Sequence, residues 1–193
     1  ATAALLIFTA ALVCTGCPGG SGQKKPGSGG GGGSGSLPPA IGSYNAATGT
    51  LTVGSVTYMM KPIADGSGLN LGVGAAASDN NGPHTVSLTA YHIGETEVTQ
   101  ELYQAVMGNN PSLFKGSSNP PDGSEEQGKR PVENINWYHA IAFCNKLSKL
   151  CNLDPCYTVT GVNFDTLNFS AIPTSDDSTW NNAVCDWSKK GFR

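Results

Sequence analysis

Apolar residues recur at helical spacing in two parts of the chain. One stripe runs through residues 137–150, and its members are three or four positions apart, as on one face of a helix. Asn136 precedes this stripe and can cap its first turn. A shorter helix is expected over 100–107, with Thr99 at the cap position and Gly108 at the C-terminal stop. The longer stripe consists of Trp137, Ala140, Ile141, Cys144 and Leu147.

The remaining segments alternate between strand-like and loop-like composition. Residues 61–83 are rich in glycine and asparagine and are expected to form a loop with at most one short strand. The prolines and glycines within residues 109–129 forbid long regular structure there. Strands are expected at 49–58 and 84–93, and shorter ones within 157–160 and 178–187. Strands followed by two helices and further irregular strands predict an α+β fold rather than alternating βαβ units.

The first seventeen residues have the pattern of an export signal. Residues 3–13 are apolar except for Thr9, which suits a signal-peptide core but falls short of the roughly 18 residues of a membrane span. The small residues that lead to Cys17 resemble the lipobox of bacterial lipoproteins, although Cys14 stands where Leu, Val or Ile is usual. The resemblance implies cleavage before Cys17 and diacylation of its thiol. A plain secretory signal cut near Gly16 and a short buried helix are the alternatives.

Glycine, serine and proline dominate the segment that follows. A tract of this composition buries little apolar surface and behaves as a flexible coil, with a reach of about 25–30 Å for this length. We therefore expect a signal core and lipobox at 1–17, a flexible linker at 18–43 and one domain over 44–193. This organisation predicts an exported protein whose lipid anchors it in the membrane of the bacterial cell envelope or surface.

Composition and motif content exclude several kinds of site. The 193 residues carry a net charge of −3 without a basic cluster, which argues against nucleic acid as a partner. The histidines His84, His92 and His139 lack the spacing of metal ligands, and the sequence contains no phosphate-binding loop or nucleophile elbow. Rather than forming an acid–base pair, one of Glu95 and Glu97 is expected to be a hydrogen-bonded structural carboxylate at the start of the following helix.

Four cysteines fall within the expected domain, at Cys144, Cys151, Cys156 and Cys185. An even number in an exported domain permits disulfides, and a bond between Cys151 and Cys156 would close a small loop. Their spacing differs from that of a zinc knuckle. Cys144 lies on the apolar stripe and suits a buried small hydrophobe. Disulfides and buried free thiols are both open interpretations.

Three phrases occur in order along the domain. They are H-x-V at His84, E-V-T ending at Thr99 and P-V-x-x-x-x-W-x-x-A from Pro131. With the residues around them, they resemble the sulfatase-modifying factor family, whose founding member is formylglycine-generating enzyme. The resemblance extends from His84 to Arg193 and implies a variant C-type-lectin-like α+β fold with little regular secondary structure.

The same resemblance implies structural roles for several residues and no catalytic ones. Thr99 caps the first helix, Asn136 and Trp137 begin the second with the indole in the core, and Cys144 matches a structural cysteine. The family's paired copper-binding cysteines and its calcium positions lie in a second half of the domain, beyond the part that this sequence matches. The resemblance therefore assigns no metal, copper, iron or calcium, to any residue here, and we expect an incomplete domain.

Three functions agree with these features. The first is a lipid-anchored, non-catalytic module that binds a protein or glycan ligand or displays a surface, as diversity-generating retroelement proteins do with this scaffold. The second is a metal-dependent oxidase of the formylglycine-generating type, or a related iron-dependent sulfoxide synthase, whose active site lies in the second half. The third is a structural lipoprotein of the envelope. We expect the first.

Overall fold

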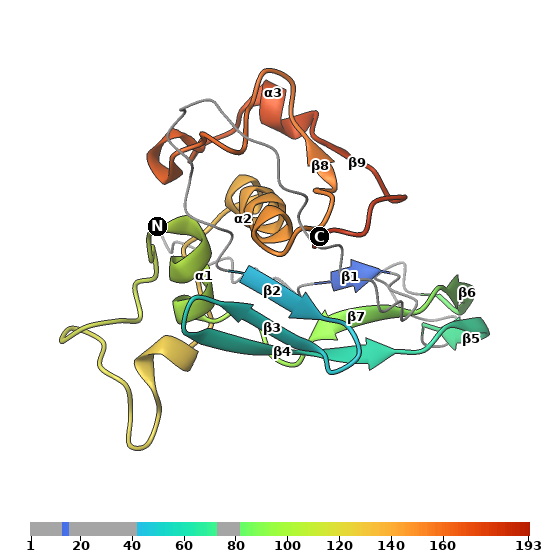
Figure 1. Cartoon of the computed structure of the whole chain (residues 1–193), viewed down its shortest axis with the longest axis horizontal. Coiled ribbons are helices and arrows are strands. Elements are labelled where there is room, and N and C mark those ends of the chain that lie inside the picture. The colour runs from blue at the N-terminus through green and yellow to red at the C-terminus, as the bar shows by residue number, and fades with distance from the viewer. Residues whose placement is uncertain (1–12, 16–41, 73–81) are drawn as a thin grey trace, which may run out of the picture.

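The computed structural model describes residues 13–15, 42–72 and 82–193, and these form an α+β structure with short strands and long loops (Figure 1). Five described strands form an antiparallel sheet in the order β1-β7-β4-β3-β2. Their bounds are β1 Val13–Thr15, β2 Gly42–Asn45, β3 Thr50–Val53, β4 Val56–Ile63 and β7 Tyr91–Gly94. Two smaller sheets pair β5 Gly66–Leu71 with β6 His84–Leu88, and β8 Tyr157–Thr158 with β9 Val184–Cys185.

The helices lie on one side of the large sheet. They are α1 Gln100–Met107, α2 Trp137–Leu150 and the short α3 Ser178–Asn181, with single 3₁₀ turns at Gln127–Lys129 and Phe169–Ala171. Figure 1 shows α2 between the sheet and the C-terminal segment that carries α3, β8 and β9. Because both sides of α2 are covered, buried side chains occur around most of its circumference. In the described ranges, no helix is long and apolar enough to cross a membrane.

Both long helices begin and end where the sequence predicts. The Thr99 hydroxyl accepts a hydrogen bond from the Leu102 amide at 3.3 Å, and Gly108 ends α1 in the left-handed conformation at φ 71°. The Asn136 side chain accepts a hydrogen bond from the His139 amide at 3.0 Å and caps α2. Local capping chemistry therefore sets the start of each helix.

Two predicted strands are each split by the structure. Residues 49–58 form a hairpin rather than one strand, because Gly54 takes the left-handed conformation at φ 58° and Val53 pairs with Val56 across the turn. The segment 84–93 divides into β6 and β7. The predicted loop 61–83 is also corrected in part, since β4 runs to Ile63 and β5 follows it.

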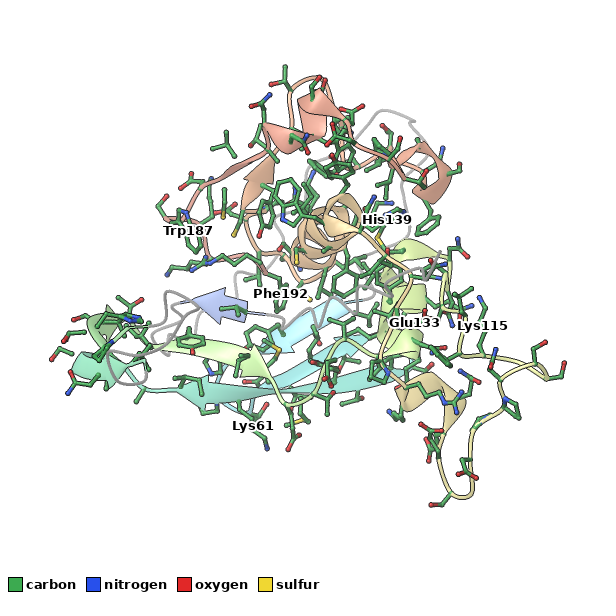
Figure 2. The ribbon with its side chains drawn as sticks, turned by 180° about the vertical axis from the view of Figure 1, so that it is seen from behind. Lys61, Lys115, Glu133, His139, Trp187 and Phe192 are labelled. Carbon is green, nitrogen blue, oxygen red and sulfur yellow. The ribbon has the colours of Figure 1, made fainter. Side chains whose placement is uncertain are left out.

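The environment of one tryptophan differs from the prediction. The expectation that the Trp137 indole lies in the core is wrong, because 39% of this residue is exposed and its ring packs edge-on against Tyr138 at 5.9 Å. Trp187 is 73% exposed, whereas Trp180 is buried. Figure 2 shows Trp187 at the outer margin and Phe192 between α2 and the sheet. The first position of α2 faces solvent, so other aromatic side chains fill the core.

Strand β1 comes from the segment expected to be an export signal. Val13 pairs with Ile93 of β7, and its backbone also exchanges hydrogen bonds of 2.9 Å in both directions with Arg193. Cys17 and residues 18–41 of the expected linker lie outside the described residues, whereas its last two residues, Gly42 and Ser43, begin β2. The structure therefore places three signal residues at the edge of the sheet and leaves the lipidation site a prediction.

Candidate functional site

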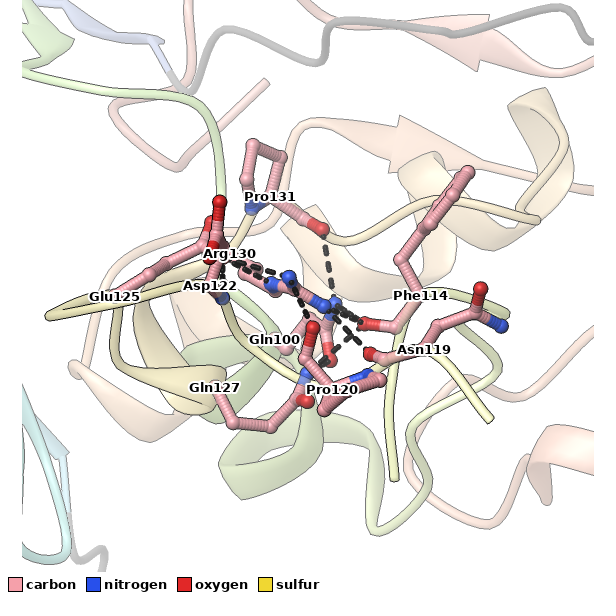
Figure 3. A network of polar contacts seen from close by, with 9 residues as sticks. All are labelled: Gln100, Phe114, Asn119, Pro120, Asp122, Glu125, Gln127, Arg130 and Pro131. Atoms are coloured by element: carbon pink, nitrogen blue, oxygen red, sulfur yellow. Dashed lines mark hydrogen bonds and ion pairs between the residues drawn. The ribbon is translucent and has the colours of Figure 1, made fainter. Parts of the chain in front are cut away.

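A loop between α1 and α2, residues 108–135, is fixed by a network around Arg130 (Figure 3). The guanidinium donates two hydrogen bonds to Glu125 Oε2, at 2.9 and 2.6 Å. It also donates to the carbonyl oxygens of Phe114 at 3.1 Å, Asn119 at 2.8 Å and Pro120 at 2.9 Å. The hydrogen bonds from Arg130 lower the pKa of the Glu125 carboxyl. One planar cation thus joins three separate backbone positions of the loop.

Gln100 supports the same loop from the first position of α1. Its residue is 1% exposed, and its amide nitrogen donates to Phe114 O at 3.2 Å and Pro131 O at 3.3 Å. Its amide oxygen accepts from Asn110 and Gln127, each at 2.9 Å. A buried amide with both ends satisfied gives the loop a single arrangement. The sequence analysis does not identify Gln100 as a functional residue. The only sequence signal for it is a polar residue at the start of an amphipathic helix.

Glu133 holds the middle of the loop. Its Oε1 accepts hydrogen bonds from the amides of Leu113 at 2.5 Å and Phe114 at 2.9 Å, while the Lys115 ammonium donates to Asn110 O. Leu113 is 55% exposed and Phe114 is 48% exposed. The loop therefore presents two apolar side chains on a backbone that is fixed beneath them.

The cap of α2 is part of a second buried polar group. Asn136 Oδ1 lies 2.6 Å from His139 Nδ1, and Asn136 Nδ2 donates to Pro173 O at 2.8 Å. His139 is 5% exposed, and its ring lies 4.8 Å from that of Phe169. Burial lowers the pKa of His139. The imidazole is therefore held neutral, and Asn136 ties α2 to the C-terminal segment.

None of the four cysteines of the domain forms a disulfide with another of the four. Cys144, Cys151 and Cys156 are buried, and Cys185 is half-buried. Of the two open interpretations, the structure does not form the possible bond between Cys151 and Cys156, and the Cys156 thiol donates a hydrogen bond to Gly191 O at 3.3 Å. Burial, with a smaller effect of Cys156 and Cys185, raises the pKa of Cys144 to about 12. Protonated, buried thiols are poor nucleophiles and metal ligands.

Metal-binding geometry is not found in the ranges that the structure describes. No three or more His, Cys, Asp or Glu side chains come together there in a way that could hold an ion. Thr99, Asn136 and Cys144 occupy structural positions, and Trp137 lies partly in solvent. Cys17 lies outside the described residues.

An open hollow of about 430 Å³ lies beside α2. Its walls come from the last turns of α2, from β8 and from the loop 159–164. The residues that bear on its chemistry are Asn145, Lys149, Tyr157, Val159, Phe164 and Lys189. Asn145 is buried and exchanges hydrogen bonds with the backbone of Tyr157 at 2.8 and 3.0 Å, which fixes β8 against α2.

Comparison with known proteins gives one family. The family model described as sulfatase-modifying factor enzyme 1-like domain matches residues 48–184. Among solved structures, variable protein 1 of Treponema denticola has 59% sequence identity and a TM-score of 0.69, over 75% of this chain and 51% of that chain. The crystal structure of CarF has 23% identity and a TM-score of 0.45, over 70% of this chain and 52% of that chain.

A curated protein shares a shorter region. Chaperone protein LppX of Paenibacillus barcinonensis is 44% identical over 82 residues, which are 42% of this chain and 24% of that protein. The chain therefore spans about half the length of the Treponema structure (51%) and about a quarter of the curated relative (24%).

Proposed function

The chain belongs to the sulfatase-modifying factor enzyme 1-like domain family, and we propose that it is part of a lipid-anchored envelope protein whose domain binds a ligand without catalysis. Family membership implies a C-type-lectin-like fold, and the observed α+β architecture with little regular structure agrees with it. Enzymes and binders share such scaffolds, so the choice between them rests on residues.

The observation that carries the proposal is the 59% identity to a Treponema protein whose name describes it as variable. A protein named for variability suits a display role, in which a constant framework presents a changing surface to a protein or glycan. This chain spans 51% of that structure, so the proposed display surface lies on a longer protein of which these residues form the framework. In this proposal the lectin-like domain is incomplete without that further part.

The fixed loop 108–135 supports a binding role. Arg130, Gln100 and Glu133 hold its backbone through charge-assisted or buried hydrogen bonds. A surface that is already ordered loses little conformational entropy when a partner binds. The exposed side chains of Leu113 and Phe114 would then contribute apolar contact area.

The described thiols belong to the framework in this proposal. Cys144 is buried, and burial raises its pKa to about 12. Cys156 is likewise buried, and its thiol donates a hydrogen bond to the Gly191 carbonyl oxygen. These thiols suit structural roles.

The anchor is the second part of the proposal. Acylated Cys17 would hold the protein at the bacterial membrane, and the Gly/Ser/Pro-rich linker over 18–43 would separate the domain from the lipid surface. Two signals, such as two acyl chains, are needed for stable anchoring. The membrane is then a partner through the lipid alone.

A conversion assay tests the non-catalytic proposal. The complete protein from its native gene is incubated with a sulfatase-derived peptide that carries the target cysteine, copper, oxygen and a thiol reductant. A formylglycine-generating enzyme treated identically is the positive control. We expect mass spectrometry to find the peptide unchanged. Conversion of the cysteine to formylglycine would replace the proposal with its alternative, an oxidase whose active site lies outside the described residues.

A further inference from the structure

The charged side chains that line the hollow beside α2 are both cationic. They are Lys149 from α2 and Lys189 from the C-terminal loop, and none of the described lining residues is acidic. The Lys149 ammonium donates to Asp165, which lies next to the hollow. The charged side chains of the lining itself are therefore of one sign.

Lys189 is half-buried and its ammonium forms no ion pair among the described residues. The carboxylate of Asp186 accepts hydrogen bonds from the amide and hydroxyl of Ser188 at 3.0 and 2.6 Å, and these bonds, with a smaller effect of the Lys189 charge, lower its pKa. The Lys189 backbone is held by Asp186 O at 3.2 Å and by the Arg193 guanidinium at 3.3 Å. A fixed backbone thus presents an ammonium that forms no ion pair with a carboxylate among the described residues.

The rest of the wall is mixed, because polar Asn145, Thr158 and Asn163 line it together with apolar and aromatic residues. Val159 and Phe164 are buried at 2% and 8% exposure and belong to the core, while Tyr157 is half-buried. Burial, with a smaller effect of Cys144 and the other neighbouring thiols, raises the pKa of Tyr157 well above its ordinary value. Its phenol is therefore a neutral hydrogen-bond donor. A volume of about 430 Å³ lies within the usual range of small-ligand sites.

We propose that this hollow binds a small ring compound that carries a carboxylate, with Lys189 as the partner of the carboxylate and the half-buried ring of Tyr157 against the ligand ring. A ring matches the exposed part of an aromatic side chain, and an anion matches lysines without acidic neighbours in the lining. The inference rests on the proposed binding function, to which it adds a ligand class at a stated site.

Titration of the ¹⁵N-labelled full chain at constant ionic strength tests the site. Sodium glucuronate and sodium benzoate are added in separate arms, and neutral glucose serves as the ligand control. Saturable shifts of the Tyr157 and Lys189 amides are expected with one of the two carboxylates and not with glucose. The arm that saturates identifies the ring as a sugar or an aromatic acid.

Two variants with the same charge change separate the site from general anion binding. Lys189→Gln is expected to weaken binding about tenfold, the effect of one lost charge-assisted hydrogen bond. Lys61→Gln is the matched control, because Lys61 lies on the side of the sheet away from α2 and pairs with Glu95 at 2.9 Å (Figure 2). Binding to this control should equal that of the parent.

The absence of saturation with both carboxylates would overturn the site, as would equal weakening by the two variants or shifts that spread away from the hollow. These results would leave the proposed function standing, because the peptide conversion assay measures it independently. Conversion of the peptide would in turn refute the proposed function without contradicting saturable ligand binding in the hollow.

Discussion

Val13 and Arg193 exchange two backbone hydrogen bonds of 2.9 Å, so residues from distant parts of the sequence meet beside β7. Val13 belongs to β1, which pairs antiparallel with β7 over three residues. Cleavage before Cys17 would remove β1 from the sheet. In a processed lipoprotein, the β7 edge and the Arg193 backbone would lose the partners that they have in the structure.

Removal of residues 1–16 should therefore expose the edge of β7. Hydrogen exchange at the amides that β1 protects within Tyr91–Gly94 is expected to quicken at least about tenfold, because an unpaired edge amide opens without breaking the core. The amides of β3 are the internal control, since β3 is paired on both sides by β2 and β4. Unchanged exchange in β7 would show that β1 does not protect this edge in solution.

Replacement of Asn136 by alanine should destabilise the domain by about 1–2 kcal/mol, since the cap of α2 is lost together with the bond to Pro173. Urea unfolding measures the change. Asn136→Ser is the matched variant, because its hydroxyl can still accept from the His139 amide, and it should recover part of the loss. An alanine variant as stable as the parent would refute the capping role.

Acid should weaken the fold through His139. Burial lowers the pKa of this imidazole in the folded protein below its ordinary value of 6.5, so the unfolded chain binds the proton more readily. The stabilisation is fully present above pH 6.5 and is lost as the pH falls from there through the folded pKa. Urea unfolding between pH 7.5 and 5 should show this slope, and His139→Gln should reduce it. The exposed His84→Gln should retain it, and an equal slope in both variants would contradict the assignment.

Arg130→Lys should loosen the loop 108–135 more than the core. Lysine keeps the charge but cannot reach Glu125 and three carbonyl oxygens with a planar fork. Chymotrypsin is expected to cut after the exposed Phe114 several-fold faster, as measured by mass spectrometry. Lys129→Gln is the control, because it removes only the ion pair to Glu101, whose carboxylate lies 2.5 Å from Lys129 Nζ. Equal cleavage of Arg130→Lys and the parent would rule out the bracing role.

The helices could be predicted because their signals are local. Thr99 and Asn136 act on amides three residues ahead, and the apolar stripe of α2 follows from its own spacing. The hairpin of β3 and β4 was missed because Gly54 interrupts a run of β-branched residues that otherwise resembles one strand. The backbone conformation at the turn, rather than the composition of the segment, decides whether such a segment forms one strand or a hairpin.

Residues whose surroundings come from distant segments could not be placed in this way. Trp137 lies on the solvent side of α2, although its spacing fits the buried stripe. Gln100 and Arg130 gain their roles from loop carbonyls that the sequence does not bring together. The hollow likewise depends on Lys189 returning to the side of α2.

The central claim, that the domain is held at the envelope by lipid on Cys17, is tested most directly by detergent-phase partitioning of the protein expressed in bacteria. We predict that the parent enters the detergent phase and that Cys17→Ala remains in the aqueous phase. Cys14→Leu is the matched control, because leucine suits that lipobox position, and it should partition as the parent does. A Cys17→Ala protein that still enters the detergent phase would contradict the account.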